Sequence, residues 1–171
     1  MNKLIFVIVF ISITALTIFT GCGGVLGGVR NVDTASRGLD SETQDFSNIV
    51  GKKWQLTEVW LDDKNTDFDR NVFANYGFTE VFTLEFSAEN ISGTGAPNRY
   101  GAPYTLGEGQ NITIMLLFST MMAPIYEPEG LREHTFFDYL HNAYQWSFSN
   151  NKLRLMSKTT DDLEIVLIFS L

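Results

Sequence analysis

The residue best placed for covalent chemistry is Cys22, the only cysteine among the 171 residues of the chain. It follows Lys3, an apolar run from Leu4 to Phe19, and the small residue Gly21. A positive charge, an apolar stretch and a small residue before a cysteine are typical of a secretory signal with a lipoprotein-type processing site. We therefore expect cleavage before Cys22, acylation of its thiol and anchoring of the mature protein to a membrane.

A membrane-spanning helix and a soluble secreted protein both fit this leader less well. An uncleaved helix over residues 4–19 would measure ~24 Å, which is short of the ~30 Å hydrocarbon core. A protein cleaved by the general signal peptidase would keep a thiol with no partner for a disulfide in an oxidising compartment. We interpret residues 1–21 as a lipoprotein signal peptide, 22–48 as a flexible Gly/Ser-rich tether and 49–171 as one folded domain.

The expected signal peptide and lipidated cysteine predict a location in a bacterial cell envelope. Gly23 follows Cys22, so the aspartate that retains some lipoproteins in the inner membrane is absent. The outer membrane is therefore favoured, with the periplasmic and surface faces both open. The net charge of −8 makes nucleic acid an unsuitable partner.

The remaining candidates for chemistry do not form a catalytic set. His134 and His141 would lie ~10 Å apart along a helix, too far to bind one zinc ion. The acidic run from Asp63 to Asp69 resembles a calcium loop, but Phe68 stands where such a loop needs glycine and Ala74 where it needs glutamate. We predict no catalytic residue, cofactor or metal site and a non-enzymatic protein, and leave weak calcium binding open.

Short runs of alternating hydrophobicity, separated by turn residues, predict strands in most of the domain. Phe82, Leu84 and Phe86 are expected to face inward, with Thr83 and Glu85 outward. The expected strands are 54–61, 81–86, 91–94, 104–106, 111–118, 145–149, 152–156 and 163–169. In the first of them Glu58 falls on the face of Trp54, which predicts a bulge or a half-exposed edge.

One helix is expected from about Glu129 to Ala143, with Phe136, Phe137 and Leu140 on its apolar stripe. A single amphipathic helix among antiparallel strands predicts an α+β fold. We expect a curved antiparallel sheet of about eight short strands, resembling a half-barrel, wrapped around that helix.

The connection from Asp62 to Thr79 carries four aromatic residues, and two interpretations of them stand side by side. They are Phe68, Phe73, Tyr76 and Phe78. They either fold back to close one end of the core, or form an aromatic surface that binds a ligand or partner.

A series of motifs in a fixed order gives the chain a resemblance to a known family. The motif residues are Gly51, Trp54, Gly93, Asn98, Tyr100, Tyr104, Thr120 and Met122. Together with the patterns around them they resemble the META domain family, whose bacterial members include HslJ-like lipoproteins. The resemblance spans 51–171 and implies structural roles for these residues, a sheet wrapped on a helix and an envelope location. It implies an association with stress tolerance, without an assigned reaction.

The chain departs from the family pattern at two positions. Pro97 and Pro124 stand where relatives often have cysteines. The joint absence is expected if those cysteines pair in the relatives, because one left alone would be a free thiol. Any cysteine chemistry of the relatives is therefore absent here.

Two functions remain in view after these steps. The first is a non-enzymatic, lipid-anchored protein that supports envelope integrity or the stress response by binding an unknown envelope protein. The alternative is a carrier or pilot-like protein that holds an acyl chain or another hydrophobic ligand between the sheet and the helix. A cavity lined by phenylalanines would favour the carrier, whereas a helix packed tightly on the sheet would count against it.

Overall fold

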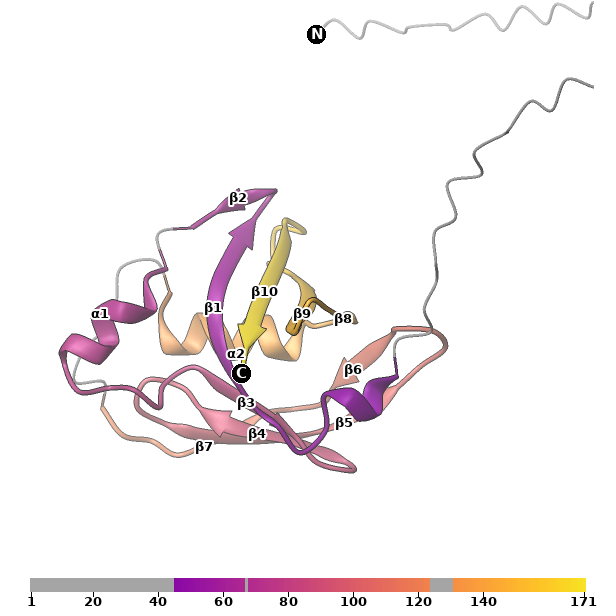
Figure 1. Cartoon of the computed structure of the whole chain (residues 1–171), viewed down its shortest axis with the longest axis horizontal. Coiled ribbons are helices and arrows are strands. Elements are labelled where there is room, and N and C mark those ends of the chain that lie inside the picture. The colour runs from indigo at the N-terminus through magenta and orange to yellow at the C-terminus, as the bar shows by residue number, and fades with distance from the viewer. Residues whose placement is uncertain (1–44, 67, 124–130) are drawn as a thin grey trace, which may run out of the picture. The chain divides into compact units, whose positions relative to one another are not determined.

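A computed structural model describes residues 45–66, 68–123 and 131–171, drawn in colour in Figure 1. The strands are β1 (Lys53–Leu61), β2 (Lys64–Asn65), β3 (Thr83–Phe86), β4 (Asn90–Thr94), β5 (Arg99–Leu106), β6 (Ile112–Ile114), β7 (Phe118–Ser119), β8 (Gln145–Ser149), β9 (Lys152–Lys158) and β10 (Glu164–Ser170). The helices are the 3-10 helix η1 (Phe46–Asn48), α1 (Arg70–Asn75) and α2 (Glu133–His141).

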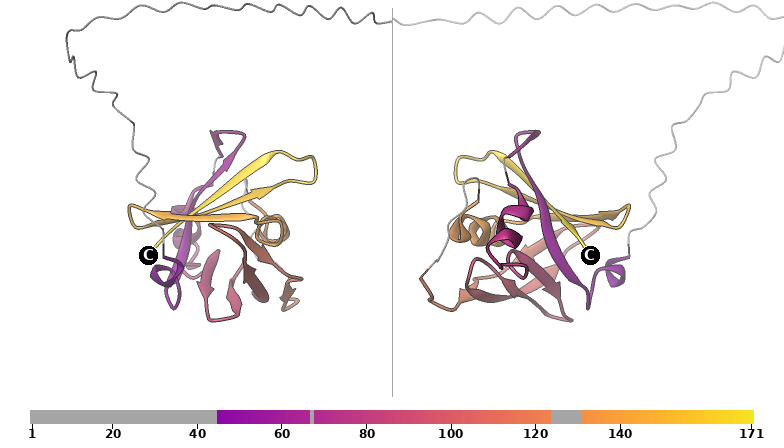
Figure 2. Two further views of the ribbon diagram at one scale, coloured as in Figure 1. Left: turned by 90° about the vertical axis from the view of Figure 1, so that its right-hand side faces the viewer. Right: turned by 60° about the vertical axis from the view of Figure 1, so that its left-hand side comes forward.

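The strands form one antiparallel sheet that closes almost into a barrel (Figure 1, Figure 2). Eight strands follow one another in the order β6-β5-β4-β3-β1-β10-β9-β8, while β2 pairs with β1 and β7 with β5. The two end strands meet at a bridge between Asn111 and Gln145. There the Ile112 amide donates to the Tyr144 carbonyl at 3.0 Å. The predicted curved antiparallel sheet is confirmed, with two short α-helices in the place of one.

Helix α2 packs against the sheet through aromatic rings. The Phe136 ring lies 5.1 Å from that of Phe82 and 5.9 Å from that of Tyr100, centroid to centroid. Phe136 and Leu140 are fully buried, as the predicted apolar stripe requires. The helix is shorter than the predicted span, because Arg132 has an extended backbone and Asn142 ends the helix. Residues 129–130 of that span lie outside the described residues.

Most strand positions follow the predicted alternation. Phe82, Leu84 and Phe86 are fully buried. The register of β1 against β10 shifts between Leu56 and Glu58, which confirms the expected bulge. The predicted span 104–106 extends back to Arg99 in β5, and 111–118 divides into β6 and β7.

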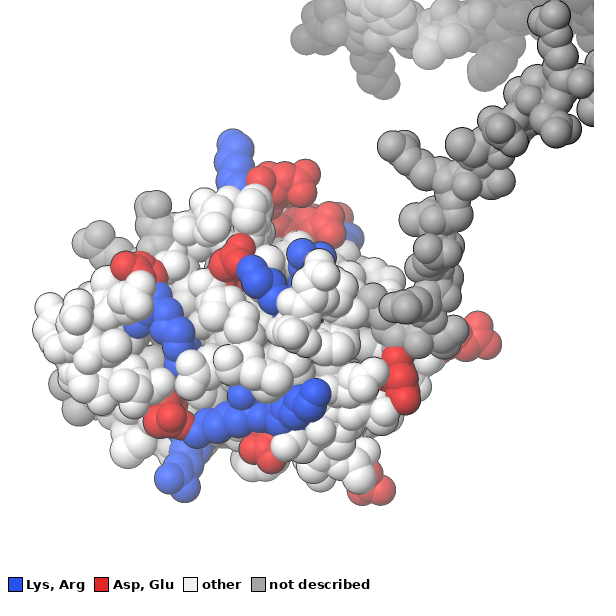
Figure 3. All heavy atoms as spheres, viewed as in Figure 1, with Lys and Arg blue, Asp and Glu red and all other residues white. Residues whose placement is uncertain are grey.

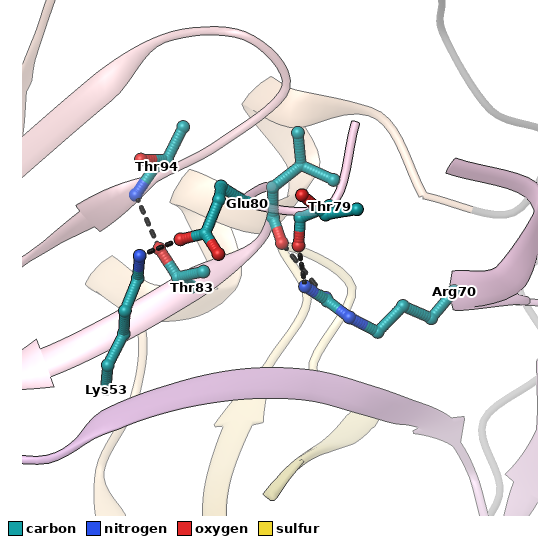
Figure 4. A network of polar contacts seen from close by, with 7 residues as sticks. Lys53, Arg70, Thr79, Glu80, Thr83 and Thr94 are labelled. Carbon is teal, nitrogen blue, oxygen red and sulfur yellow. Dashed lines mark hydrogen bonds and ion pairs between the residues drawn. The ribbon is translucent and has the colours of Figure 1, made fainter. Parts of the chain in front are cut away.

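Thr83 does not face outward into solvent as predicted, because it is only 1% exposed. Its hydroxyl accepts a hydrogen bond from the Thr94 amide at 3.0 Å, in the place of a strand partner (Figure 4). Its carbonyl accepts one from the Tyr100 hydroxyl at 2.7 Å. A buried threonine is stable where both of its polar groups are bonded in this way.

The connection after β1 contains a tight turn, β2 and α1, which the sequence pattern did not indicate. Asp62 and Asp63 adopt positive φ angles of 48° and 60°, as the two-residue turn of the hairpin between β1 and β2 requires. Asp69 then caps α1 by accepting from the Asn71 amide at 2.9 Å.

Arg70 fixes α1 to the sheet where β1 and β3 diverge. Its guanidinium donates to the carbonyls of Leu56 at 3.1 Å, Val81 at 2.9 Å and Thr79 at 2.9 Å. Figure 4 shows this side chain reaching the main chain at Thr79, beside an ion pair between Lys53 and Glu80. Burial lowers the pKa of Arg70 from its ordinary value, but a guanidinium stays charged at neutral pH.

The folded domain begins before residue 49, so the predicted boundary of the tether is too late. Residues 46–48 form η1, which is capped by Asp45. The Phe46 ring packs against those of Phe86 at 5.2 Å, Tyr104 at 5.6 Å and Trp146 at 4.9 Å. The predicted signal peptide, Cys22 and the rest of the tether lie outside the described residues. In the described part of the chain, no helix is long and apolar enough to cross a membrane.

Candidate functional site

The buried amide of Asn98 forms the centre of a polar junction. Its Nδ2 donates to Glu133 Oε2 at 2.6 Å and to the Met122 carbonyl at 3.0 Å. Its Oδ1 accepts from the Met122 amide at 2.6 Å and from the Thr120 hydroxyl at 2.8 Å. Two donated and two accepted bonds use the full capacity of a side-chain amide. Asn98 is therefore held in one orientation, and it holds residues 120–122 beside β5.

Glu133 completes the junction from the first turn of α2. Its Oε1 accepts from the amides of Ala96 at 2.5 Å and Asn98 at 2.6 Å. A carboxylate in the first helical turn also interacts favourably with the positive end of the helix dipole. A Cβ atom on Gly95 would lie 2.5 Å from Oε1, so only glycine lets the carboxylate come this close. The junction joins the loop before β5, the segment after β7 and α2.

Gly93 in β4 and Tyr100 in β5 both lie against the carbonyl oxygen of Thr83 in β3. A Cβ atom on Gly93 would lie 2.1 Å from the Thr83 carbonyl oxygen, the atom to which the Tyr100 hydroxyl donates. Burial raises the pKa of the Tyr100 hydroxyl well above its ordinary value, so it remains a donor at any physiological pH. These two residues therefore hold the strands β3, β4 and β5 at close separation.

The other motif residues also lie in the framework of the domain. Trp54 Nε1 donates to the Ile49 carbonyl at 2.9 Å, and Gly51 has a φ of 71° in the turn before β1. The Tyr104 hydroxyl donates to the Ser87 carbonyl at 2.8 Å. Such contacts position strands and bring no reactive group to a surface.

The predicted aromatic surface on residues 62–79 does not hold for two of its four members. Phe68 and Phe73 are 7% and 2% exposed, and both rings pack on Phe82. Phe78 is half-buried against the same core, whereas Tyr76 is 62% exposed. The interpretation that these aromatics close the core therefore describes Phe68 and Phe73, and Tyr76 alone is largely accessible.

The residues considered for metal binding have other contacts. His141 Nδ1 lies 3.1 Å from the Met115 carbonyl, and His134 Nε2 lies 3.4 Å from the Thr135 hydroxyl. Asp69 caps α1. Asp67 lies outside the described residues. No group of three or more His, Cys, Asp or Glu side chains that could hold a metal ion occurs within the described ranges.

Sequence reasoning missed an exposed apolar segment, Met115–Met122, which we call the apolar edge. Its large exposed side chains are Met115 (45%), Leu116 (81%), Phe118 (68%), Met121 (98%) and Met122 (52%). Alternating hydrophobicity predicted a strand over 111–118, which includes the first part of this segment, and a strand prediction does not say which faces stay uncovered. A local signal of this surface was nevertheless present, because no charged residue lies between Glu108 and Glu127.

The apolar edge runs along one side of β5. The Met115 amide donates to the Pro103 carbonyl at 2.9 Å, and the Thr120 amide donates to the Arg99 carbonyl at 3.0 Å. Between them Phe118 pairs with Gly101. A Cβ atom on Gly101 would lie 2.7 Å from the Phe118 ring, so this glycine lets the ring lie over the strand.

Both ends of the apolar edge are connected to α2, one through Asn98 and the other directly by His141. At the end of the segment Asn98 holds Thr120 and Met122 while bonding to Glu133. At its start His141 Nδ1 donates to the Met115 carbonyl, since a carbonyl can only accept. The apolar edge is therefore presented on a fixed frame, and its chemistry suits recognition of another apolar surface.

A family model and one solved structure agree with the fold. A META domain model matches residues 47–167. The fold is similar to the solved solution structure of a protein from Burkholderia xenovorans, at a TM-score of 0.51 and 17% identity over 72% of this chain and 85% of that one. A DUF4847 family protein from Bacteroides vulgatus gives a TM-score of 0.48 at 14% identity, over 72% and 94% of the two chains. No curated protein matches the sequence.

Proposed function

The chain belongs to the META domain family, and on this premise we propose that it is a lipid-anchored envelope protein that acts by binding and catalyses no reaction. Its role is to support envelope integrity or the response to envelope stress. Acylation of Cys22 supplies the anchor, and residues 22–44 supply the tether. The outer membrane is the favoured location because of Gly23.

The observation that carries this proposal is the apolar edge. Monomeric proteins rarely leave large apolar side chains together in solvent, and such groups mark surfaces that contact another molecule. Leu116, Phe118 and Met121 are each more than two-thirds exposed within a few residues of one another. Methionine adds an adaptable side chain that can pack on varied apolar surfaces.

The packing of α2 supports binding at the surface over the carrier function. A carrier needs space between the sheet and the helix, and here that region holds the rings of Phe82 and Phe136 in edge contact at 5.1 Å. The rings of Phe68 and Phe73 also pack on Phe82, at centroid distances of 5.8 and 5.3 Å. Side chains that interdigitate in this way leave little room for an acyl chain.

The proposal is tested in cells that lack the protein and receive it back in altered forms. Cys22→Ser, made with a leader that the general signal peptidase cleaves so that residues 4–19 are not retained, removes the acylation site. A double variant, Leu116→Ser with Met121→Ser, removes two side chains of the apolar edge that are 81% and 98% exposed, so folding should be retained. The matched control is Tyr76→Ser with Leu171→Ser, two other apolar side chains that are 62% and 66% exposed.

Membrane fractionation and survival under envelope stress, such as detergent or heat, are the two measurements. We expect Cys22→Ser to leave the membrane fraction. The double variant of the apolar edge should remain in the membrane fraction but lose protection, and the control should keep both. Full protection by the double variant would overturn the role of the apolar edge, and membrane retention of Cys22→Ser would overturn the anchor.

A further inference from the structure

We propose that the partner of the apolar edge is the surface of the lipid bilayer to which Cys22 attaches the chain. The inference rests on the proposed function, since it needs the anchor, and it names the partner of the same site. In this arrangement the side chains of Leu116, Phe118 and Met121 enter the boundary between head groups and acyl chains. The domain then lies on the membrane in one orientation.

The charge distribution favours a bilayer at this part of the chain. The protein is acidic, with a net charge of −8, so its charged surfaces gain nothing from anionic head groups. Residues 109–126 contain no charged side chain and include the whole apolar edge. On the face drawn in Figure 3, acidic and basic side chains are interspersed. The uncharged apolar edge is therefore the segment that can enter the interface without bringing ions out of water.

The length of the tether keeps the bilayer within reach. The segment from Cys22 to residue 44 has 23 residues and is rich in glycine and serine. Even fully extended, a chain of this length spans no more than about 80 Å. The membrane is thus always close to the domain, and the high effective concentration makes a weak apolar contact sufficient. A soluble partner has no such advantage.

The position of the apolar edge at the margin of the sheet suits a shallow contact with the bilayer. Strand β7 is bonded to β5 alone among the described strands, so the apolar edge lies at a margin of the sheet. Natural sheets protect such edges with charged side chains or cover them, whereas Met115–Met122 contains no charged side chain. Its main chain cannot enter the hydrocarbon, where unpaired amides are costly, but it can lie at the hydrated head-group level. The bonds from Asn98 and His141 fix both ends, so binding needs little further ordering.

The test uses the mature, acylated protein in vesicles of phosphatidylethanolamine and phosphatidylglycerol, with no other protein present. Cysteine is introduced singly by Leu116→Cys, Met121→Cys and, as a control on the loop after α1, Tyr76→Cys, and each is labelled with a nitroxide. Acylated Cys22 does not react with the label. The spectra measure collision of each nitroxide with oxygen, which concentrates in the bilayer, and with a nickel complex, which stays in water.

We expect labels at 116 and 121 to collide more with oxygen and several-fold less with nickel than the label at 76. Equal, water-like collision at all three sites would overturn the proposal. If the intact mass still showed the acyl groups, the anchor and the proposed function would stand. Spectral broadening caused by contact between labels at position 116 of different molecules, without a gain in collision with oxygen, would show that the apolar edge binds a second copy of the chain. That result would also overturn the proposal.

Discussion

Asn98 donates two hydrogen bonds to the Glu133 carboxylate, one from its main-chain amide to Oε1 and one from Nδ2 to Oε2, both at 2.6 Å. The amide of the same side chain holds the main chain of Met122. One buried residue thus connects α2, the start of β5 and the end of the apolar edge. We infer that the presentation of the apolar edge depends on this pair.

Replacement of Asn98 by alanine should therefore destabilise the domain and loosen the apolar edge. The change leaves the Met122 amide and one oxygen of Glu133 without their partners, which costs about 2–4 kcal/mol of the free energy of unfolding. Urea denaturation gives the free energy, and hydrogen exchange at the Met122 amide gives the local effect. The matched control is Asn90→Ala, at an exposed position of β4. Equal stability of the two variants would contradict the role of the junction.

Two glycines of the sheet should respond differently to alanine. Gly93→Ala brings a methyl group onto the Thr83 carbonyl, a main-chain atom that cannot move aside, and should cost about 3 kcal/mol. Gly101→Ala meets only the Phe118 ring at close range, which is 68% exposed and can rotate away, so it should cost less than about 1 kcal/mol. Thermal or urea unfolding compares the two directly. A larger loss for Gly101→Ala would show that Phe118 is held rigidly in place.

Leu140 tests whether α2 is part of the core. It is fully buried, and its replacement by alanine leaves a cavity that should lower the free energy of unfolding by about 2–5 kcal/mol. Leu106→Ala, at a position that is 45% exposed, is the control of the same chemistry. A near-neutral result for Leu140→Ala would contradict the assignment of this helix to the core.

The lowered pKa of Glu58 predicts how the stability of the domain changes with pH. Hydrogen bonds from Lys152 and Trp60 lower the pKa of its carboxyl below the ordinary value. The charged form is therefore favoured in the folded state, and the stabilisation is present above the unfolded pKa of about 4.3 and is lost as pH falls through the folded pKa. Because the side chain is 27% exposed, we expect a gain of only about 0.2–1 kcal/mol.

Glu58→Gln measures this contribution by urea unfolding over a range of pH. The variant should be less stable than the wild type at pH 7, and the difference should shrink as pH falls below about 4.3 and through the lowered pKa of Glu58. Glu85→Gln, at an exposed position of β3, controls for the general effect of losing a negative charge. A difference that stayed constant from pH 7 to pH 3 would show that the ionised carboxylate is not its source.

The alternation of hydrophobic residues was sufficient to predict the central strands, because it depends only on neighbours along the chain. Phe82, Leu84 and Phe86 are buried as expected, and β8 has its predicted bounds. Helix α1 was missed because six residues give too short a pattern. Its stability depends on Arg70 reaching the carbonyls of Leu56 and Val81 on other segments.

The candidate site could be predicted only in part, for a related reason. The motif identified Asn98, Thr120 and Met122 as important, but not that they bond to one another or to Glu133, 35 positions from Asn98. The exposure of Leu116 and Met121 depends on which strands cover the edge of β5, and sequence alternation carries no information about that. The charge-free run between Glu108 and Glu127 was the one local signal of this surface.

The mass of the protein extracted from its own membranes tests the central claim most directly. Native and intact mass spectrometry, with lipid analysis of the same sample, determines the first residue, the groups attached to it and any retained ligand. We predict a chain that begins at Cys22, carries acyl groups on that residue and holds no further lipid between the sheet and the helix. An unmodified Cys22 would contradict the anchor, and a stoichiometric retained acyl ligand would show that the protein is a carrier.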